Sequence, residues 1–460
     1  MLRIGSAQSD ITPPLPIPMG GSFLKFKSRE LLDPIMASCV AADDGPSRTA
    51  VVSCDLGSVP RGLVLSAREK AAEATGIPED SIHIMATHNH SGPTVHPASE
   101  NPFAGDNELA LVERIREKLA VDIAACIIEA HDRLMPARMG YGCGRFDGGA
   151  FNRRFIMSNG RSRMHGGKNL ERLKPEGPTD REAQAVWFED HEGKHLAVMV
   201  NYTSHPTNFY GMPTVSADFP GVMRNILQGV LGDELPVLYL QGACGNIMCH
   251  DIDNPNHAGG IDNSRRIGRG LAGEVLRIMS DNFAGAGEAR VASTGRTVDI
   301  PYREVPPLPA DEAAARWEHY KTRWEEFRAL DIEERAAINS TFRLAAFKEK
   351  SPACPVEISA FALGDVLFVT NPAELFVEYQ LDIKERFKDR RVIVTELTNG
   401  RIGYVPTRLA CALGGYEAIQ TRFNPGAGET IRDIGCELIE SLLKEPIIQR
   451  DLSGSGASHR

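Results

Sequence analysis

The sequence predicts an α/β fold, with a mixed β-sheet core flanked by helices, and two observations support this. Short apolar runs rich in β-branched residues alternate along the 460-residue chain with longer segments of helical periodicity. A hydrophobic content of 42% together with 24% charged residues supplies enough apolar surface for a large buried core. This size and composition fit one large domain or two moderate ones.

The predicted elements follow one another in this alternating order. The first strand covers residues 49–55 and leads into a helix over 62–75, and the next strand stops before His88 and precedes a helix over 106–131. No internal repeat is recognisable. Most predicted strands end close to a residue of chemical interest, so we expect their ends to converge on one site. Further strands are predicted over 185–188, 196–202, 236–241, 366–370 and 391–398, and further helices over 219–231, 263–283 and 429–443.

Two segments look like insertions into this pattern. Residues 140–180 are Gly-rich and carry eight basic residues in an otherwise acidic chain. These charges would either attract an anionic substrate or pair locally on a solvated loop, and the sequence leaves both interpretations open. Residues 307–350 are charged and helical, which is typical of a solvated hairpin of two helices. The Ser- and Gly-rich tail over 451–460 is predicted to be disordered.

The charge of the chain argues against one class of partner. A formal net charge of −10, with no phosphate-binding loop and no basic helix, is unlike a nucleic-acid-binding protein. The sequence begins without a signal peptide and has no apolar run of about 18 residues, so we expect no transmembrane segment and a cytoplasmic location. The nine cysteines lack a C-x-x-C pair and are expected to be mostly buried thiols.

The densest group of candidate metal ligands is one short segment that contains His83, His88, His90 and His96, four of the 13 histidines. Side chains two residues apart in an extended backbone point to the same side, so His88 and His90 could enter one pocket. Imidazole is a common ligand of zinc and its neighbours. A His-x-His pair alone is equally consistent with ordinary surface and core histidines, so other segments must decide.

Later strand ends carry further candidates. His205 precedes a proline, which holds it in an extended or turn conformation. The turn after the strand over 236–241 contains Gly242 and Gly245, which would let backbone N–H groups approach a substrate closely. Glu374 follows a buried strand and a proline turn, where a carboxylate could complete a metal site.

Two tyrosines follow the last predicted strand. Tyr404 lies at the far end of the turn after that strand, and Tyr416 comes twelve residues later behind a Gly-Gly pair. A phenol beside a metal ion can ligate it or donate a hydrogen bond to an oxyanion. A lone Tyr near a strand end is usually structural, so the order of the segments carries more weight than any one residue.

That order resembles the catalytic domain of the neutral/alkaline, non-lysosomal ceramidase family. The opening I-G-S-A-Q-S-D-I-T-P-P, the strand V-V-S-C-D-L-G and the motif M-A-T-H-N-H-S-G-P are similar to motifs of that family. The segments F-N-R-R, H-P-T, Q-G-A-C-G-N, N-P-A-E and N-G-R-I-G-Y-V-P-T follow in the family's order. The resemblance runs from about residue 3 to residue 445 and implies a single metallohydrolase domain over residues 1–450.

Carried over position by position, the resemblance implies a bound zinc ion. His90 would lie behind the ligands or handle protons, while Arg153 and Tyr416 would bind and polarise the substrate carbonyl. Asp218 also matches a family position and is expected to support the site. The implied zinc ligands are His88, His205, Glu374 and Tyr404.

Two departures from the family pattern argue against ceramide as the substrate. Where ceramidases carry a serine after the glutamine of their turn, this chain has Gly242, so a serine nucleophile is excluded there. Cys244 lacks a paired base nearby and is expected to be a buried thiol. We also expect this chain to lack the family's C-terminal β-sandwich domain and an export signal.

These features lead to the hypothesis that the chain hydrolyses an amide (N-acyl) or ester bond with metal-activated water. His90 would help to deprotonate the water and to protonate the leaving group, while Arg153 and Tyr416 stabilise the oxyanion. The basic residues in the 140–180 segment suit a small, polar and anionic substrate better than a long-chain lipid.

Two alternatives stay open. A zinc-dependent carbohydrate-active enzyme, a deacylase or a lyase, would also begin by polarising a carbonyl or carboxyl group. A non-catalytic metal-binding homologue would keep the ligands without turnover, but it would not need His90, Arg153 and Tyr416. The sequence leaves the oligomeric state open.

Overall fold

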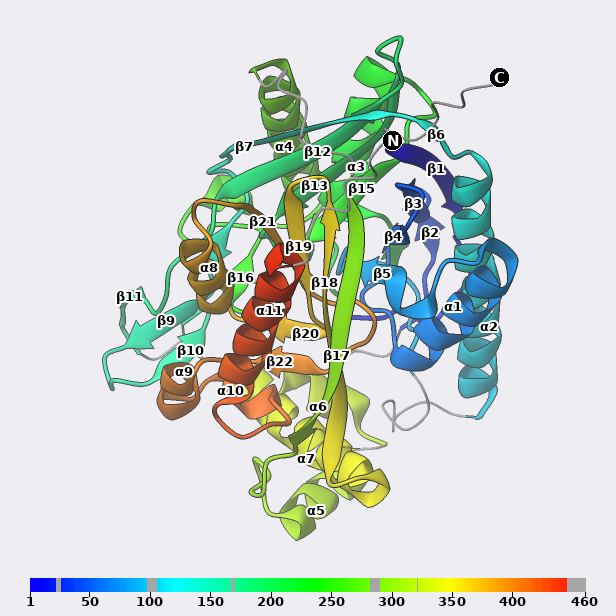
Figure 1. The fold of residues 1–460 in the computed structure, drawn as a ribbon. Coiled ribbons are helices and arrows are strands. Elements are labelled where there is room, and N and C mark those ends of the chain that lie inside the picture. Colours follow the sequence, from blue (N-terminus) through cyan, green and yellow to red (C-terminus); the bar gives the residue numbers. More distant parts are fainter. Residues whose placement is uncertain (22–25, 97–105, 167–169, 282–289, 321, 445–460) are drawn as a thin grey trace, which may run out of the picture.

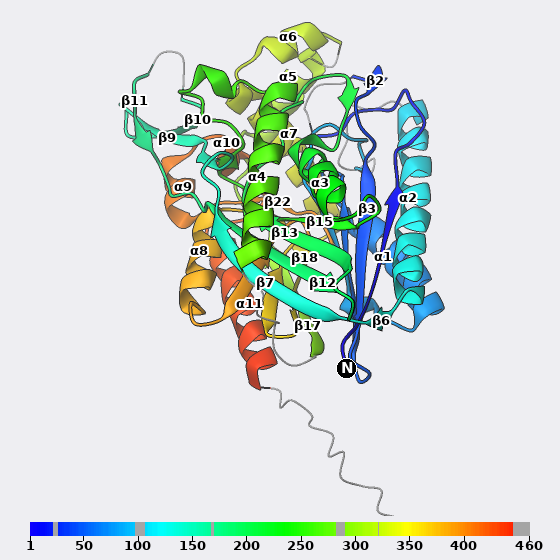
Figure 2. The same ribbon diagram turned by 90° about the horizontal axis from the view of Figure 1, so that it is seen from above.

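Three large β-sheets surround the centre of the molecule, and helices cover the outer face of each of them (Figures 1 and 2). The computed structural model describes residues 1–21, 26–96, 106–166, 170–281, 290–320 and 322–444. The predicted α/β class, with mixed sheets flanked by helices, is confirmed. The predicted disordered tail lies outside the described residues.

The first sheet is built by the N-terminal part of the chain. Neighbouring strands are antiparallel except for one parallel pair, which helix α1 (Arg61–Thr75) connects. Helix α2 (Asp106–Asp132) follows, and both helices pack on the outer face of this sheet. In sheet order the strands are β5 (Ile82–Ala86), β4 (Arg48–Cys54), β3 (Met36–Asp43), β1 (Arg3–Asp10) and β6 (Met135–Pro136).

The second sheet has the same plan. Its parallel pair is connected by helix α3 (Asp218–Leu231), and helix α4 (Ile261–Asp281) follows the last strand. Phe219, Met223 and Ile267 on these helices pack against the sheet. In sheet order the strands are β15 (Val237–Gln241), β13 (His195–Tyr202), β12 (Glu182–Glu189) and β7 (Arg138–Arg145).

The third sheet repeats the plan once more. Helix α8 (Val377–Arg386) connects its parallel pair, and helix α11 (Ala427–Lys444) packs on the outer face. In sheet order the strands are β17 (Val291–Pro301), β18 (Ala353–Leu363), β19 (Val366–Thr370) and β21 (Arg391–Thr395).

Each of these sheets forms one unit with its helices, and the three units share one topology, which is two antiparallel pairings, one parallel β-α-β crossover and a closing helix. The first unit adds a third antiparallel pairing, of β6 with β1. This repeat is not visible in the sequence, because the units resemble each other in strand order and not in residues. Each parallel pair sends the carboxyl ends of two strands in the same direction, and such ends are where α/β sheets bind ligands.

A shared core lies where the inner faces of the three sheets meet. It contains Val51 from the first sheet, Phe188 from the second, and Phe361 and Phe368 from the third, all fully buried. The rings of Phe361 and Phe368 are stacked with centroids 4.4 Å apart. Because residues from all three units fill this core, no unit can bury its inner face without the other two.

Some strands were missed in the sequence. The predicted strands and helices are all present, with ends within a few residues, but β1, β3, β7, β17 and β18 were not predicted. β7 is rich in glycine, and the middle of β17 is polar and exposed, so neither has the apolar alternation of a buried strand. Pairing with neighbouring strands, which the sequence does not display, stabilises both.

The segment predicted as a two-helix hairpin contains three helices. They are α5 (Ala310–Tyr320), α6 (Trp324–Ala329) and α7 (Ile332–Lys350), and they lie together beyond one end of the sheets (Figure 1). The prediction of a solvated hairpin is wrong for α7, because seven of its residues, Asn339 among them, are buried.

The basic segment over 140–180 is not a loop. It holds most of β7 and a small sheet of β9 (Arg154–Met157), β10 (Ser162–Met164) and β11 (Arg172–Pro175). Five of its arginines lie within ion-pair distance of carboxylates, so pairing within the fold accounts for much of its charge. The pairs are Arg145 with Asp147, Arg153 with Glu417, Arg154 with Glu176 and Glu417, Arg163 with Asp331 and Glu333, and Arg172 with Asp253.

All nine cysteines are free, and seven of them are buried, as predicted. Over the part of the chain that the structure describes, none of the helices combines the length and the apolar character needed to cross a bilayer.

Candidate metal centre

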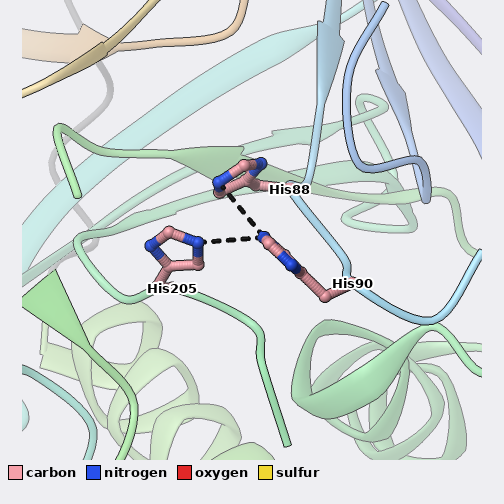
Figure 3. Close-up of side chains that lie close together, drawn as sticks. All are labelled: His88, His90 and His205. Atoms are coloured by element: carbon pink, nitrogen blue, oxygen red, sulfur yellow. Dashed lines mark hydrogen bonds between the residues drawn. The ribbon is translucent and has the colours of Figure 1, made fainter. Parts of the chain in front are cut away.

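The three units each send one candidate ligand to a common point. His88 follows β5 in the first unit, His205 follows β13 in the second, and Glu374 follows β19 in the third. This is the predicted convergence of strand ends. Figure 3 shows the imidazoles of His88, His90 and His205 turned toward one another.

The atoms that meet are the Nε2 nitrogens and one carboxylate oxygen. His90 Nε2 lies 3.0 Å from His205 Nε2 and 3.5 Å from His88 Nε2. His88 Nε2 lies 3.6 Å from Glu374 Oε2. The three histidines together form a group whose ligand atoms all lie within 4.8 Å of one another, close enough to hold one metal ion.

The outer nitrogens of these rings show that the group fits a cation. Nδ1 of His88 and Nδ1 of His90 each lie 2.7 Å from a backbone oxygen, of Gly57 and Gly21 respectively. A carbonyl only accepts, so both Nδ1 atoms carry the proton and both Nε2 atoms are left as lone pairs. Two lone pairs and the Glu374 carboxylate then face one another, and a bound cation would relieve their repulsion.

The third imidazole has two neighbours at Nδ1. Arg153 Nη1 lies 3.3 Å away and the Cys244 carbonyl oxygen 3.4 Å away. Burial, and after it the neighbouring His88, lower the pKa of His205 well below its ordinary value. The same two causes lower the pKa of His90 to about 3. Both imidazoles are therefore neutral at ordinary pH, the form in which histidine binds metals.

The backbone at His88 is strained. Its φ angle is +66°, which few residues other than glycine adopt, although His, Asn and Asp do so more often than other side chains. Such a conformation costs on the order of 1–3 kcal/mol and persists only where the surroundings fix it. Here the His88 N–H donates to the Leu56 carbonyl at 3.0 Å, while the ring is held from the other side by Gly57.

Glu374 and Tyr404 lie side by side on a short parallel pair, β20 (Ala373–Leu375) and β22 (Gly403–Val405). Burial, followed by the Glu374 charge, raises the pKa of Tyr404 well above its ordinary value of 10. The phenol is therefore neutral unless a metal ion lies beside it. Tyr404 is thus placed where it could become a ligand together with Glu374.

Arg153 and Tyr416 complete the predicted constellation. The Arg153 guanidinium carbon lies 5.4 Å from the centre of the Tyr404 ring, and the rings of Tyr404 and Tyr416 are 5.6 Å apart. Burial, and next the nearby Tyr210, raise the pKa of Tyr416 far above its ordinary value, so its hydroxyl is available as a hydrogen-bond donor. Arg153 and Tyr416 therefore both carry polar hydrogens beside Tyr404, at the cavity that the histidines line.

A buried carboxylate that the sequence analysis missed holds these groups in place. Glu417 is fully buried and accepts from Arg153 Nε at 2.8 Å and from Arg154 Nη1 at 2.6 Å. Arg153 Nη2 donates to the Gly245 carbonyl at 2.9 Å, which fixes the guanidinium further. In the sequence, the only signals of this network are the adjacent arginines Arg153 and Arg154 and the acidic residue directly after Tyr416.

All seven predicted site residues line one cavity of about 780 Å³. His83, from the same histidine-rich segment, does not. Its ring is stacked on Phe361 with centroids 4.4 Å apart, and its nitrogens face the hydroxyls of Ser293 and Ser359. Burial lowers the pKa of His83 to about 3, and the charge of Arg68 contributes to the same shift. His83 is a core histidine, the ordinary alternative that the sequence left open.

The predicted role of the glycine turn is wrong. Backbone N–H groups of Gly242, Ala243 and Gly245 donate to Tyr202, Gln380 and Leu375, and none of these three turn residues lines the cavity. A Cβ on Gly242 would overlap Thr203 Oγ1 and lie 3.1 Å from Gln380 Oε1. The turn needs glycine for packing and not for substrate contact.

Two other predictions are confirmed nearby. Cys244 is a fully buried thiol, which donates to Glu396 at 3.0 Å, and burial raises its pKa well above the ordinary value. Asp218 supports the loop after His205, because it accepts from the backbone N–H and the side chain of Asn208, at 2.9 and 2.7 Å.

The remaining lining residues were not predicted. They include Asn339, Arg343 and Phe347 of α7, and Arg401 and Arg422 near the C-terminus. Charged and polar residues on an amphipathic helix usually face solvent, so no feature of the sequence placed α7 beside the site.

Solved structures with this arrangement of elements exist. The chain superposes on the neutral ceramidase from Pseudomonas aeruginosa with a TM-score of 0.75 at 19% identity, covering 96% of this chain and 74% of that one. A ceramidase complexed with C2 gives a TM-score of 0.72 at 18% identity, covering 98% of this chain and 77% of the other. No protein-family model matches the sequence. The predicted ceramidase-like fold is confirmed.

Proposed function

We propose that this chain, with its ceramidase-like fold, is a zinc-dependent hydrolase that cleaves an amide (N-acyl) or ester bond with metal-activated water. The observation that carries the proposal is the set of imidazole nitrogens and the carboxylate that meet at the cavity. The side chains come from three separate units, and the outer nitrogens of His88 and His90 are already fixed by backbone carbonyls. The proposed ligands are His88, His205, Glu374 and Tyr404.

A bound zinc ion would supply a Lewis acid that lowers the pKa of a water molecule to about 7. The residues of the chain would do the rest. Arg153 and Tyr416 donate to the carbonyl oxygen of the substrate and stabilise the negative charge that develops there. Each such donor typically contributes about 10²–10³ in rate.

His90 is proposed to handle the proton. Its Nε2 faces the other two histidines, and its Nδ1 donates to Gly21, a bond that would stabilise the imidazolium once Nε2 is protonated. The same Nε2 is also near enough to the others to act as a further ligand. The metal content of a His90 variant separates these two roles.

A nucleophilic serine is not part of the proposal. The position at which the sequence resemblance would place it is Gly242, outside the cavity. Water is therefore the proposed nucleophile, and the substrate is proposed to be small and polar and not ceramide.

The test combines metal analysis with turnover. We expect near-stoichiometric zinc by elemental mass spectrometry in the wild type, and loss of zinc in His88→Ala and His205→Ala. His90→Ala should keep zinc and lose turnover of N-acyl or ester substrates by at least about a hundredfold. His83→Ala, which changes a histidine outside the cavity, is the matched control and should keep zinc.

Three results would contradict the proposal in different ways. Absence of metal from a folded wild type supplied with zinc would rule out the hydrolase mechanism. Loss of zinc in His90→Ala would make His90 a ligand, and an unsaturated product would indicate elimination instead of hydrolysis.

A further inference from the structure

Beyond the histidines, the cavity continues between α7 and the short helix α10 (Tyr416–Gln420). Gln420 lies four residues after Tyr416, so both side chains emerge on the same face of α10, one turn apart. Ser340 of α7 donates to Gln420 Oε1 at 2.9 Å. This end of the cavity is polar, and the proposed chemistry does not use it.

Two buried amide atoms at this end have no hydrogen-bond partner among the described residues. They are Oδ1 of Asn339 and Nε2 of Gln420. Asn339 is only 5% exposed, and both residues line the cavity. A buried polar atom without a partner is costly, so native proteins keep such atoms mainly where a ligand or water satisfies them.

Two arginines lie at the same end. Arg343 lies one turn after Asn339 on α7, and Arg422 follows α10. The Arg422 guanidinium carbon lies 4.0 Å from the centre of the Phe347 ring of α7, which holds this cation against the cavity wall. The acidic residues that line the cavity within the described chain are Glu108 and the proposed ligand Glu374.

We propose that this end of the cavity, the α7–α10 subsite (Asn339, Ser340, Arg343, Gln420 and Arg422), binds an anionic group of the substrate. The group is a carboxylate or a phosphate on a molecule that also carries hydroxyl or amide groups. Arginine suits such anions, and the two orphaned amides suit the neighbouring polar atoms.

This subsite rests on the proposed function, and it predicts how far the anionic group lies from the scissile bond of the substrate. Tyr416 would contact the scissile carbonyl, and Gln420 lies one helical turn further, which is about 5 Å. The anionic group should therefore lie beyond the scissile bond by roughly that distance. A ceramide-type lipid amide carries hydroxyl groups but no anionic group that could pair with the arginines.

The experiment measures binding separately from turnover. The probes are N-acetylglucosamine 6-phosphate, N-acetylneuraminic acid and neutral N-acetylglucosamine, titrated calorimetrically into zinc-loaded and chelator-treated protein. We expect at least one of the two anions to bind about tenfold or more tightly than the neutral sugar, with and without zinc. Whether the phosphate or the carboxylate is preferred then identifies the anion.

The variants separate this subsite from general charge effects. Arg343→Met should abolish the preference for the anion. Arg335→Met removes a cation from the same helix at a position that does not line the cavity, and it should leave the preference unchanged. Asn339→Leu should weaken binding of the preferred anion while raising the melting temperature of the free protein, because it removes an unsatisfied buried amide.

Three results would overturn the subsite. They are equal affinity for charged and neutral probes, a preference that survives in Arg343→Met, and a preference that disappears when zinc is removed. A preference that depends on Arg343 in a protein without hydrolytic activity would support the subsite and contradict the proposed function, so the two can fail separately.

Discussion

Glu417 is the single residue on which the geometry around Arg153 most depends. Its two oxygens accept from two different arginines, and it is fully buried. Burial raises the pKa of Glu417, but the charges of Arg154 and Arg153 outweigh burial and hold the pKa below its ordinary value. The carboxylate is therefore ionised and positions Arg153 at the candidate site without contacting the proposed ligands.

Replacing Glu417 with Gln should test this positioning role. The variant leaves two buried guanidinium groups with one partner fewer, so we expect a loss of about 3 kcal/mol in the free energy of unfolding, measured in urea. Turnover should fall at least about tenfold because Arg153 loses its fixed orientation, while zinc content stays unchanged.

The matched control is Glu437→Gln. Glu437 also pairs with an arginine, Arg296 at 2.8 Å, but both side chains are about half exposed. Removing this surface pair should change stability by less than about 1 kcal/mol. An equally small effect at Glu417 would show that the buried network does not hold Arg153.

At the scale of elements, packing around the turn after β15 explains why this chain has glycine where the resemblance would place a catalytic serine. The sequence places glycine where the ceramidase resemblance would place serine, and the space around Gly242 is filled by Thr203 and Gln380. Gln380 of α8 also donates to Asp180 and Thr203 at 2.7 Å each, so this neighbourhood is fixed from several sides.

A Gly242→Ser variant should therefore lose stability and gain no chemistry. We expect a decrease of about 1–3 kcal/mol in the free energy of unfolding, because the new side chain must displace Thr203 or Gln380. Gly273→Ser in α4 is the control, since a Cβ there meets no atom within 4 Å. If the Gly242→Ser variant kept full stability and its new hydroxyl reacted with a serine-directed acylating reagent, this account would be wrong.

Helix α7 lies beside the candidate site, although the sequence predicted that this segment would be a solvent-exposed hairpin. Its cavity-lining residues include Ile332, Asn339, Arg343 and Phe347, which recur on one face of the helix. The charged residues of this segment masked that face in the sequence, because their number suggested a helix solvated all round.

At the scale of the whole molecule, three units of equal topology meet at one core and at one proposed metal centre. His88, His205 and Glu374 come from different units, so an ion bound there would connect all three. A ligand that binds only the folded state raises the free energy of unfolding. The increase grows with the ratio of the free ligand concentration to the dissociation constant.

Removal of the metal should therefore lower the melting temperature of the entire protein. With free zinc a thousandfold above its dissociation constant, the stabilisation lost would be about 4 kcal/mol. Differential scanning calorimetry with and without a chelator measures this change, which should vanish in Glu374→Gln. An equal melting temperature with and without chelator would show that the three units do not depend on an ion.

The fold class and most of the candidate constellation could be predicted from the sequence. Alternating apolar and helical runs are local signals, and His88, His205, Glu374 and Tyr404 follow strands that such signals identify. Their order along the chain also carried the family resemblance, so no distance was needed to group them.

Only the folded structure shows which charged side chains face the site. Arg154, Arg163 and Arg172 looked available in the sequence but are paired with carboxylates, most of them far along the chain. Arg343 and Gln420 looked like ordinary surface residues but line the cavity. The physical reason is that a charge is neutralised or exposed by its neighbours in space, and those neighbours are set by packing between distant segments.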